Sequence, residues 1–385
     1  IYGHLGHLKR IKRDHPDMKI VLFGCMMQEH HVVEKIRKDY KYVNLVFGTH
    51  NIHKFPELFY RTLQTDDQII DIWKESDEIV EGMPTSRKYS FKTGVSVMFG
   101  CNNFCSYCIV PYVRGREKSR EPQAIIREIE ELVADGVTEI MLLGQNVNSY
   151  GKTLETPVTF AELLKEVEKI EGLKRIRFMT SHPKDLSDEL IQTMAESQKI
   201  CHHLHLPLQS GSSRVLKEMN RRYDKEKYLE LVDKIRKAIP DISLTTDIMV
   251  GFPGETEEEF AVTKQYLEKI HFYEMHIFKY SKRQGTKAAK MSDQIDEQIK
   301  TKRSNELLAL EKKMSKEFRD AHIGKEDEAL LEEPVQIDGV DYYVGFTKEY
   351  VKVAVRSEKD LSNCMVRGRI EGALNENVYL MTAYS

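Results

Sequence analysis

Hydrophobic and polar residues follow three different patterns along the chain. Residues 1–72 contain two short apolar runs, at 19–24 and 42–48. They also contain two segments with helical periodicity, at 4–13 and 30–39. Strands that alternate with helices are typical of a small parallel sheet, so we predict an α/β domain here. The segment 73–92 is polar, contains Pro84 and lacks sustained periodicity, and we interpret it as a linker.

The middle of the chain, residues 93–319, repeats one unit six times: an apolar strand, a polar or glycine-bearing strand end, then a helix. The predicted strands are 95–99, 139–143, 175–179, 203–206, 244–250 and 275–280. Predicted helices include 122–134, 160–170, 225–238 and 255–270, and a long charged helix follows at 298–319. Successive βα units predict an all-parallel, right-handed sheet, closed or nearly closed into a (β/α)6 barrel.

Beyond residue 320 the pattern changes to short strands alone, at 328–335, 341–346, 350–355, 365–374 and 377–382. Such closely spaced strands predict a small antiparallel barrel. We therefore expect an α/β protein with an N-terminal domain (1–72), a linker (73–92), a parallel barrel (93–319) and a C-terminal barrel (320–385).

Composition narrows the class of protein. Lys and Arg number 58 and Asp and Glu 61, so the formal net charge of −3 offers no bulk attraction for nucleic acid. With 41 % hydrophobic and 31 % charged residues the chain is typical of a soluble globular protein. It lacks an apolar run of the about 20 residues that a membrane helix needs, and its start does not resemble a signal peptide. We expect a cytoplasmic protein without a membrane partner.

Active sites of parallel α/β barrels lie at the carboxyl ends of the strands. All six predicted strand ends carry groups that bind ligands, at 101–108, 144–146, 180–183, 207–211, 251–254 and 281–285. The first contains three of the six cysteines, Cys101, Cys105 and Cys108. Six cysteines are too few for a disulfide scaffold in a chain of this length, and clustered thiolates favour zinc or iron–sulfur.

The number of clustered cysteines helps to distinguish a zinc site from an iron–sulfur cluster. Structural zinc takes four protein ligands in spaced pairs, and no second pair follows this one at such a distance. Three thiolates instead hold three irons of a cubane and leave the fourth iron open to another ligand. Zinc and a purely structural role remain as alternatives at this point. Cys201 and Cys364 lie in or beside apolar strands, and we expect them to be buried.

The Cys-x3-Cys-x2-Cys spacing after the first barrel strand resembles that of the radical SAM superfamily. The stretch 100–120, together with 142–151, 205–211, 246–256 and 278–286, closely resembles the methylthiotransferase family over nearly the whole chain. The C-terminal barrel is similar to the TRAM RNA-binding module. The resemblance implies S-adenosylmethionine as cofactor, bound by a [4Fe–4S] cluster on Cys101, Cys105 and Cys108.

The resemblance also implies a second, auxiliary [4Fe–4S] cluster on three cysteines of the N-terminal domain. Cys25, in Gly24-Cys-Met-Met-Gln28, matches the last of them, and neither Cys201 nor Cys364 matches the others. The chain starts at Ile1 without an initiator Met, so we expect a truncated N-terminal domain whose other two ligands lie upstream.

The implied reaction adds a methylthio group to C2 of N6-isopentenyladenosine next to the tRNA anticodon. A 5′-deoxyadenosyl radical removes the C2 hydrogen, and the auxiliary cluster delivers a methylated sulfur, with a second S-adenosylmethionine as methyl donor. Such a C–H bond is too inert for acid–base chemistry, and a barrel interior protects a radical from solvent. The implied partners are the tRNA anticodon loop and an electron donor such as flavodoxin.

Further site residues follow from the strand ends. The cofactor candidates are Gly144, Gln145, Asn146, Ser181, His182, Gln209, Ser210 and Asp247. Gly144 permits close approach of a ligand to the backbone, and the resemblance implies a contact with the methionine part of the cofactor. An ordinary βα turn at Gly144, and a capping role for His182 before Asp185, are the structural alternatives.

RNA binding must be local, because residues 321–385 carry 7 basic against 12 acidic side chains and so are net acidic by 5. The RNA-binding candidates are Arg114, Arg116, Lys348, Lys352 and Arg367. The secondary candidates are the basic residues Lys118, Arg120, Arg221, Arg222 and Arg369, the basic stretch 9–13, and the aromatic side chains of Tyr342, Tyr343 and Phe346. The structural alternative is a set of solvated charged faces and barrel core aromatics.

Three alternative functions stay open. A related methylthiotransferase acts on threonylcarbamoyl-adenosine in tRNA, and another acts on a ribosomal protein. The third alternative, from a different class, is a non-catalytic, metal-stabilised RNA-binding protein.

Overall fold

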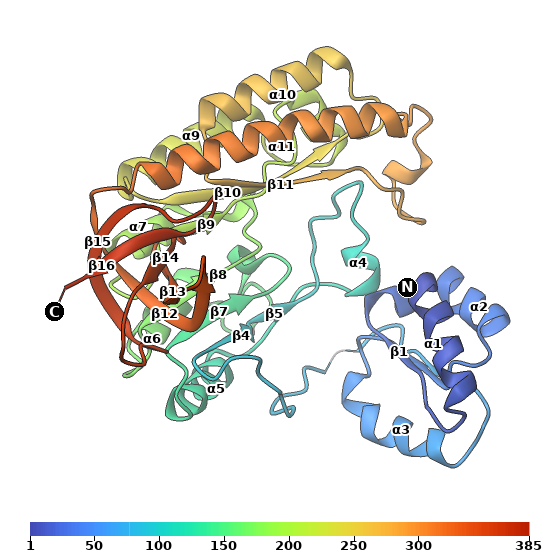
Figure 1. The fold of residues 1–385 in the computed structure, drawn as a ribbon. Helices are drawn as coiled ribbons and strands as arrows, with labels where there is room; N and C mark the ends of the chain where they lie inside the picture. The colour runs from blue at the N-terminus through green and yellow to red at the C-terminus, as the bar shows by residue number, and fades with distance from the viewer. Residues whose placement is uncertain (77, 385) are drawn as a thin grey trace. The chain divides into compact units, whose positions relative to one another are not determined.

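The computed structural model describes residues 1–76 and 78–384, which form two compact units (Figure 1). The first comprises residues 1–86 with 99–102 and 109–117, and the second residues 87–98, 103–108 and 118–385. The loop that contains Cys101, Cys105 and Cys108 therefore contributes to both units.

The first unit is a three-stranded parallel sheet with helices. Its strands are β1 (Val21–Phe23), β2 (Leu45–Phe47) and β3 (Ile69–Asp71), in that order. Its helices are α1 (Tyr2–Asp14), α2 (His30–Asp39), α3 (Phe55–Leu63), α4 (Val110–Val113) and the 3-10 turns η1 (Cys25–Gln28) and η2 (Ile52–Lys54). Leu5, Val32, Ile36 and Val46 pack one core cluster of this unit. The predicted parallel sheet is confirmed.

The second unit contains the six predicted parallel strands. They form two three-stranded sheets: β4 (Lys92–Ser96), β7 (Glu139–Leu143) and β8 (Arg175–Phe178), and β9 (His203–His205), β10 (Ser243–Val250) and β11 (Glu274–Lys279). An isolated parallel bridge, Ile176 to Ile200, lies between β8 and the segment before β9. The barrel is thus not closed by a continuous hydrogen-bonded sheet. The predicted strand 95–99 divides between β4 and β5 (Met98–Phe99), and the pairing of β5 with β6 (Lys118–Ser119) was not predicted.

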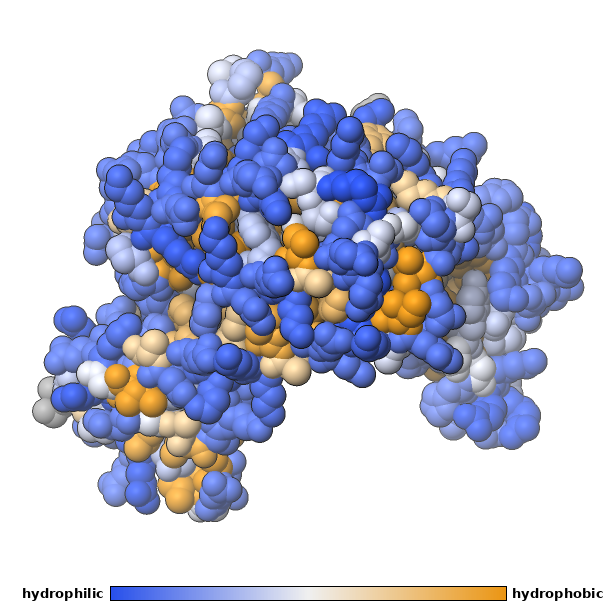
Figure 2. Space-filling model, turned by 90° about the horizontal axis from the view of Figure 1, so that it is seen from above, coloured by the Kyte–Doolittle hydropathy of each residue, from blue (hydrophilic) through white to orange (hydrophobic). Residues whose placement is uncertain are grey.

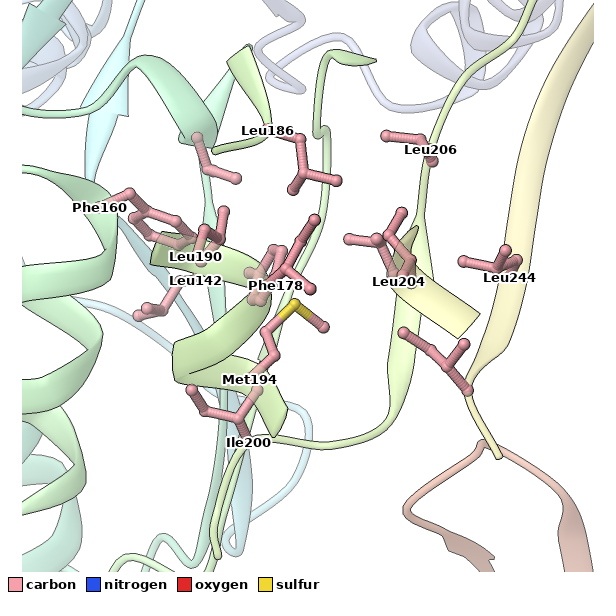
Figure 3. Packing of buried hydrophobic residues seen from close by; sticks show 14 of the residues in the cluster. Leu142, Phe160, Phe178, Leu186, Leu190, Met194, Ile200, Leu204, Leu206 and Leu244 are labelled. Carbon is pink, nitrogen blue, oxygen red and sulfur yellow. The ribbon is translucent and has the colours of Figure 1, made fainter. Parts of the chain in front are cut away.

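Helices cover the apolar side of these strands. They are α5 (Pro122–Ala134), α6 (Phe160–Glu168), α7 (Asp188–Glu196), α8 (Ser213–Glu218), α9 (Lys225–Ala238), α10 (Glu257–Ile270) and α11 (Glu297–Asp320), with the turns η3 (Val147–Ser149), η4 (Pro183–Asp185) and η5 (Ala288–Lys290). Figure 3 shows Phe178 and Leu204 of the strands gathered with Phe160 and Met194 of the helices. Because side chains alternate along a strand, the neighbouring residues face the opposite side.

The C-terminal barrel is closed by five strands: β12 (Glu326–Ile337), β13 (Val340–Thr347), β14 (Lys352–Val355), β15 (Met365–Ala373) and β16 (Tyr379–Ala383). Four neighbouring pairs are antiparallel, as predicted. The pair β14–β16 is parallel, which corrects the prediction of a wholly antiparallel barrel. Directions cannot alternate around a closed ring with an odd number of strands, so one pair must be parallel.

Surface properties agree with the composition. One face of the molecule is mostly hydrophilic, with apolar residues in small separate groups (Figure 2). Within residues 1–76 and 78–384, no helix is both long and apolar enough to cross a membrane. The two remaining cysteines differ in burial: Cys201 is buried, as predicted, whereas Cys364 is only half-buried, which corrects that prediction. Cys364 precedes β15 in a loop, where Leu331 pairs with its carbonyl but its side chain is outside the barrel core.

Two acidic side chains, Asp327 and Glu349, interact in the second unit, where the C-terminal barrel meets the parallel strands. Glu349 is 6 % exposed. Burial, followed by the neighbouring Glu349 carboxylate, raises the pKa of Asp327 well above its usual range, and Arg175 offsets this only in part. The native state therefore retains a proton that the unfolded chain loses at lower pH.

We expect Asp327→Asn to stabilise the protein at pH 8 by about 1 kcal/mol or more, because the amide needs no proton and carries no charge toward Glu349. Since the native pKa is the raised one, wild-type stability falls as the pH rises from the ordinary aspartate pKa to the raised value. The gain should therefore shrink on acidification to pH 4. Thermal unfolding across this pH range measures it, with the exposed Asp341→Asn as control, and parallel pH profiles for Asp327→Asn and wild type would contradict it.

Candidate metal and cofactor site

The cysteine loop begins with a tightly folded segment in the first unit. Cys101 is buried, and its backbone N–H donates to the carbonyl of Gly115 at 3.2 Å. Gly100 has a φ of +73°, and a Cβ atom there would lie 2.0 Å from the carbonyl oxygen of Arg116. Only glycine therefore fits immediately before this cysteine.

The rest of the loop is attached to the end of α8 in the second unit. Ser106 donates its backbone N–H to Met219 O and its hydroxyl to Glu218 O, at 3.0 and 2.7 Å. The amide of Asn220 donates to Phe104 O at 2.9 Å. Cys105 and Cys108 are joined in one tight turn, because Cys108 N donates to Cys105 O at 2.9 Å. These bonds fix the backbone of the loop around Cys105 and Cys108.

A buried guanidinium accompanies one of these thiols. Arg221, 8 % exposed, donates from Nη1 to Cys105 Sγ at 3.4 Å and from Nη2 to Pro207 O at 2.8 Å. Its Nε donates to the Tyr223 hydroxyl at 2.8 Å. The prediction that Arg221 belongs to an RNA surface is wrong, because this side chain is enclosed. The hydrogen bond from this guanidinium therefore orients the Cys105 side chain.

The cysteine chemistry fits an iron–sulfur cluster. None of the cysteines in the described residues forms a disulfide. Three thiols within eight residues, one of them beside a guanidinium, provide the soft anionic donors that iron–sulfur clusters and zinc require.

Three strand ends each carry a buried polar atom without a hydrogen-bond partner in the described residues. These atoms are Asn146 Oδ1 after β7, Ser181 Oγ after β8 and Gln209 Oε1 after β9. Such groups are costly to bury unsatisfied, by about 1–3 kcal/mol each. Gln209 also has a φ of +74° and Thr180 one of +66°, and strained backbone of this kind clusters at functional sites. The carboxyl ends of adjacent strands are therefore prepared for a polar ligand.

The remaining cofactor candidates are more strongly tied to the fold. A Cβ on Gly144 would lie 2.6 Å from Met98 Cγ, so close packing already accounts for this glycine. The Ser210 hydroxyl accepts from Ser212 N at 3.2 Å. Gln145 is half-buried. None of these contacts excludes a ligand contact, and the roles of these residues stay predictions.

His182 caps the turn that follows β8. Its Nδ1 accepts from Lys184 N at 3.2 Å, as the capping alternative predicts. Burial, with the nearby Arg221 and Lys184, lowers the pKa of His182 to about 2. The imidazole is consequently neutral throughout the physiological range.

Asp247 lies between two histidines on the inner side of the strands. His205 Nε2 and His276 Nδ1 are each 3.4 Å from Asp247 Oδ1. His205 is buried and anchored by Thr245 Oγ1 at 2.9 Å, whereas His276 is exposed. The histidines were not predicted, although their alternation with Leu204 and Leu206 along the chain was a signal that could have identified them.

The first unit holds a second thiol beside an arginine. Arg114 Nε donates to Cys25 Sγ at 2.9 Å. Cys25 opens η1 directly after β1, where Gly24 has a φ of +113°. Arg114, predicted to bind RNA, thus has a partner in its own unit.

The other RNA candidates differ in their contacts. Arg120 is buried, with Nη2 2.7 Å from Glu128, so the structural alternative of a solvated charged side chain is wrong for this residue. Lys348 Nζ donates to Gln198 O at 2.7 Å, and Lys352 lies over the Phe346 ring at 5.8 Å. Arg116 and Arg367 are both exposed. RNA binding by these residues stays a prediction.

Known proteins provide an independent comparison. Residues 95–267 match the model of the Radical SAM superfamily. A tRNA-2-methylthio-N(6)-dimethylallyladenosine synthase of Lachnoclostridium phytofermentans is 55 % identical over 94 % of this chain and 79 % of its own. A protein of the same name from Clostridioides difficile is 54 % identical over 86 % of this chain and 70 % of its own. A solved radical S-adenosylmethionine methyltransferase from Kitasatospora setae has a TM-score of 0.45 and 18 % identity, covering 55 % of this chain and 42 % of that one.

We expect Arg221→Met to lower both the melting temperature and the iron bound per polypeptide after anaerobic reconstitution. The substitution leaves Pro207 O without its donor and removes the charge beside Cys105, and losing such a buried partner costs about 2–4 kcal/mol. The adjacent, exposed Arg222→Met is the matched control and should behave as wild type. Equal iron content and stability in the two variants would refute this role for Arg221.

Proposed function

This chain belongs to the family of tRNA-2-methylthio-N(6)-dimethylallyladenosine synthases, and we propose that Cys101, Cys105 and Cys108 hold the [4Fe–4S] cluster on which this activity depends. The observation that carries the assignment is the identity of 55 % over 94 % of the chain, combined with three cysteines at the required spacing after the first barrel strand. Three thiolates leave one iron open for S-adenosylmethionine.

The chain is accordingly a radical SAM tRNA methylthiotransferase. Its substrate is tRNA, in which it adds a methylthio group to C2 of N6-isopentenyladenosine. The names of the relatives favour this substrate over threonylcarbamoyl-adenosine or a ribosomal protein. The radical SAM match likewise argues against a non-catalytic RNA-binding protein.

The chain's own residues bind and orient the cofactor. When bound, the cluster supplies the electron that breaks a carbon–sulfur bond of S-adenosylmethionine. We assign its polar contacts to Asn146, Ser181 and Gln209, because each has a buried atom that a ligand would satisfy. Gly144, Gln145, His182, Ser210 and Asp247 complete the proposed cofactor residues.

Neutral His182 suits this position. Its Nδ1 is occupied as an acceptor for Lys184 N, so Nε2 carries the proton and can donate one hydrogen bond. Because its pKa is about 2, His182 would add no positive charge to the proposed cofactor site at neutral pH.

An auxiliary [4Fe–4S] cluster in the N-terminal domain is the second metal centre that we propose. Cys25 is one ligand, and Arg114 Nε donates a hydrogen bond to its sulfur at 2.9 Å. The other two ligands are not in this sequence, in which Cys25 is the only cysteine before residue 101.

We further propose that the tRNA is recognised at its anticodon loop, where the target base can leave the stack. Arg116, Lys352 and Arg367 are the candidates for RNA contact, with Arg114 and Lys348 engaged in protein contacts as well. The domain limits 1–72, 73–92, 93–319 and 320–385 remain our proposed division. A cytoplasmic location and a reductant such as flavodoxin complete the proposal.

Cluster binding gives one test. We expect Cys105→Ala to lose about four irons per polypeptide after anaerobic reconstitution, because two thiolates do not retain a cubane. Cys364→Ala removes a half-buried thiol of the C-terminal barrel and should keep the wild-type iron content. Iron analysis and the visible absorption of the cluster measure both variants, and full iron content in Cys105→Ala would exclude the assignment.

Substrate choice gives another test. The reduced protein, loaded with both proposed clusters, should convert isopentenylated tRNA to the methylthio product and leave threonylcarbamoylated tRNA unchanged. Mass spectrometry of digested nucleosides measures the products. Modification of the threonylcarbamoylated tRNA alone would assign the protein to the related activity.

A further inference from the structure

The C-terminal barrel contacts the amino-terminal ends of the parallel strands within the second unit (Figure 1). Lys92, the first residue of β4, forms an ion pair with Glu332 at 2.5 Å. Thr138, just before β7, donates to Asn363, and Tyr273, just before β11, donates to Tyr350 O at 3.2 Å. The contacts therefore involve both three-stranded sheets.

Two arginines of β8 make the central contacts. Arg175 donates from Nη1 to Phe346 O at 2.5 Å and from Nη2 to Glu328 O at 2.8 Å. Arg177 donates from Nη2 to Thr347 O at 2.9 Å and from Nη1 to Lys348 O at 3.2 Å. Together they bind three successive carbonyls within residues 346–350, the end of β13 and the turn that follows it, which we call the β13–β14 connection.

These guanidiniums are buried almost completely, with 0 % exposure for Arg175 and 1 % for Arg177. Arg177 Nε is 3.4 Å from Glu139 Oε2, and its other partners are carbonyl oxygens. Desolvating a charge costs several kcal/mol, and a buried ion pair is weak support for stability alone. Apolar residues would fill the same space, so the arginines indicate a need to hold the connection in one position.

Tyr350 fixes the connection a second time. Its ring stacks on His203, with centroids 4.8 Å apart, and on Phe346, at 4.7 Å. The Arg177 guanidinium lies 4.3 Å from the centre of the same ring. Tyr350 has a φ of +72°, which is unfavourable for a non-glycine residue and persists only where neighbours enforce it.

The same strands carry the proposed cofactor site at their other ends. Only three residues separate Arg177 from Ser181 along the chain, and only five separate His203 from Gln209. Arg177 and His203 face the side opposite to the apolar core formed by Ile176, Phe178 and Leu204. This face of the strands thus contacts the β13–β14 connection at its amino end, and the proposed cofactor residues Asn146, Ser181 and Gln209 follow the strands at the carboxyl end.

We propose that the C-terminal barrel, held by Arg175 and Arg177, is the floor of the reaction chamber. It closes the amino end of the parallel strands, so that substrate reaches the cofactor from the carboxyl end alone. The RNA-binding module would then have a second task, which is to exclude small hydrogen donors from the radical. The protection of the radical rests on the proposed function, whereas the attachment of the C-terminal barrel to the amino ends of the strands does not.

Hydrogen–deuterium exchange tests the structural part on the chain as it stands. In Arg177→Met, amides of 175–178 and 346–350 should exchange at least about tenfold faster than in wild type, because the connection loses two donors. Arg356→Met, an exposed arginine of the same barrel, is the matched control. Tyr350→Asn is the second variant: it removes the ring, and asparagine tolerates a positive φ, so folding should be preserved. Wild-type exchange in both test variants would overturn the proposal.

Turnover tests the chemical part. The cleavage of S-adenosylmethionine takes up one electron and yields methionine and a radical, which leaves as 5′-deoxyadenosine after taking a hydrogen atom. In the reduced, cluster-loaded protein with tRNA, Arg177→Met and Tyr350→Asn should release several-fold more 5′-deoxyadenosine per methylthio product than wild type and Arg356→Met. An unchanged ratio, despite faster exchange at the connection, would overturn the floor role.

The two tests separate this inference from the assigned activity. If wild type makes no methylthio product, the proposed function fails, while 5′-deoxyadenosine released without substrate still compares the variants. If wild type makes product and the variants lose coupling, both proposals hold. Arg177→Lys should restore part of the coupling, since lysine keeps a donor but loses the planar stack on Tyr350.

Discussion

Each parallel strand of the second unit has an apolar face that packs against helices and an inner face that carries polar side chains. The rest of the unit depends on this constraint. Ile176 and Phe178 of β8 pack against the helices, while Arg175 and Arg177 alternate with them and face inward. A buried guanidinium needs partners, and the strand itself has none to offer, because its backbone groups pair with neighbouring strands. The C-terminal barrel supplies the missing carbonyls. The inner face of β8 therefore depends on the C-terminal barrel for the hydrogen-bond partners of its two arginines.

The two ends of the parallel strands differ in what their polar side chains contact. At the amino ends, the Nη atoms of Arg175 and Arg177 donate to carbonyls of the C-terminal barrel, while the Nε atoms of both side chains have no hydrogen-bond partner among the described residues. At the carboxyl ends, Asn146, Ser181 and Gln209 keep polar atoms without partners in the described residues. Unsatisfied groups lower stability, and the three at the carboxyl ends are consistent with a site that binds a polar ligand. The amino ends of the strands thus attach the C-terminal barrel, and the carboxyl ends carry the proposed cofactor site.

Much of the fold was predictable from the chain. The periodicity located α2, α5, α9 and β7 at their observed limits, because the apolar residues of each element recur at its own period. The cysteine spacing identified the metal loop, since the three ligands lie in one short segment. Interactions between distant segments were not predictable: Arg221 had the same charge as Arg222, yet only Arg221 is enclosed beside Cys105. A count of charges does not distinguish a buried cation from a solvated one.

The sequence by itself determined the class of chemistry, because thiolates at fixed spacing form a local property of the chain that needs no distant partner. It also determined which elements form, since hydrophobic periodicity is local as well. Only the tertiary structure decided which polar residues face inward, which of them pair, and which remain for a ligand. The parallel β14–β16 pair belongs to this second group, because closure of a ring is a condition on all five strands together. The attachment of the β13–β14 connection to Arg175 and Arg177 belongs there too, because it joins segments about 170 residues apart, as Arg175 and Phe346 are separated by 171 positions.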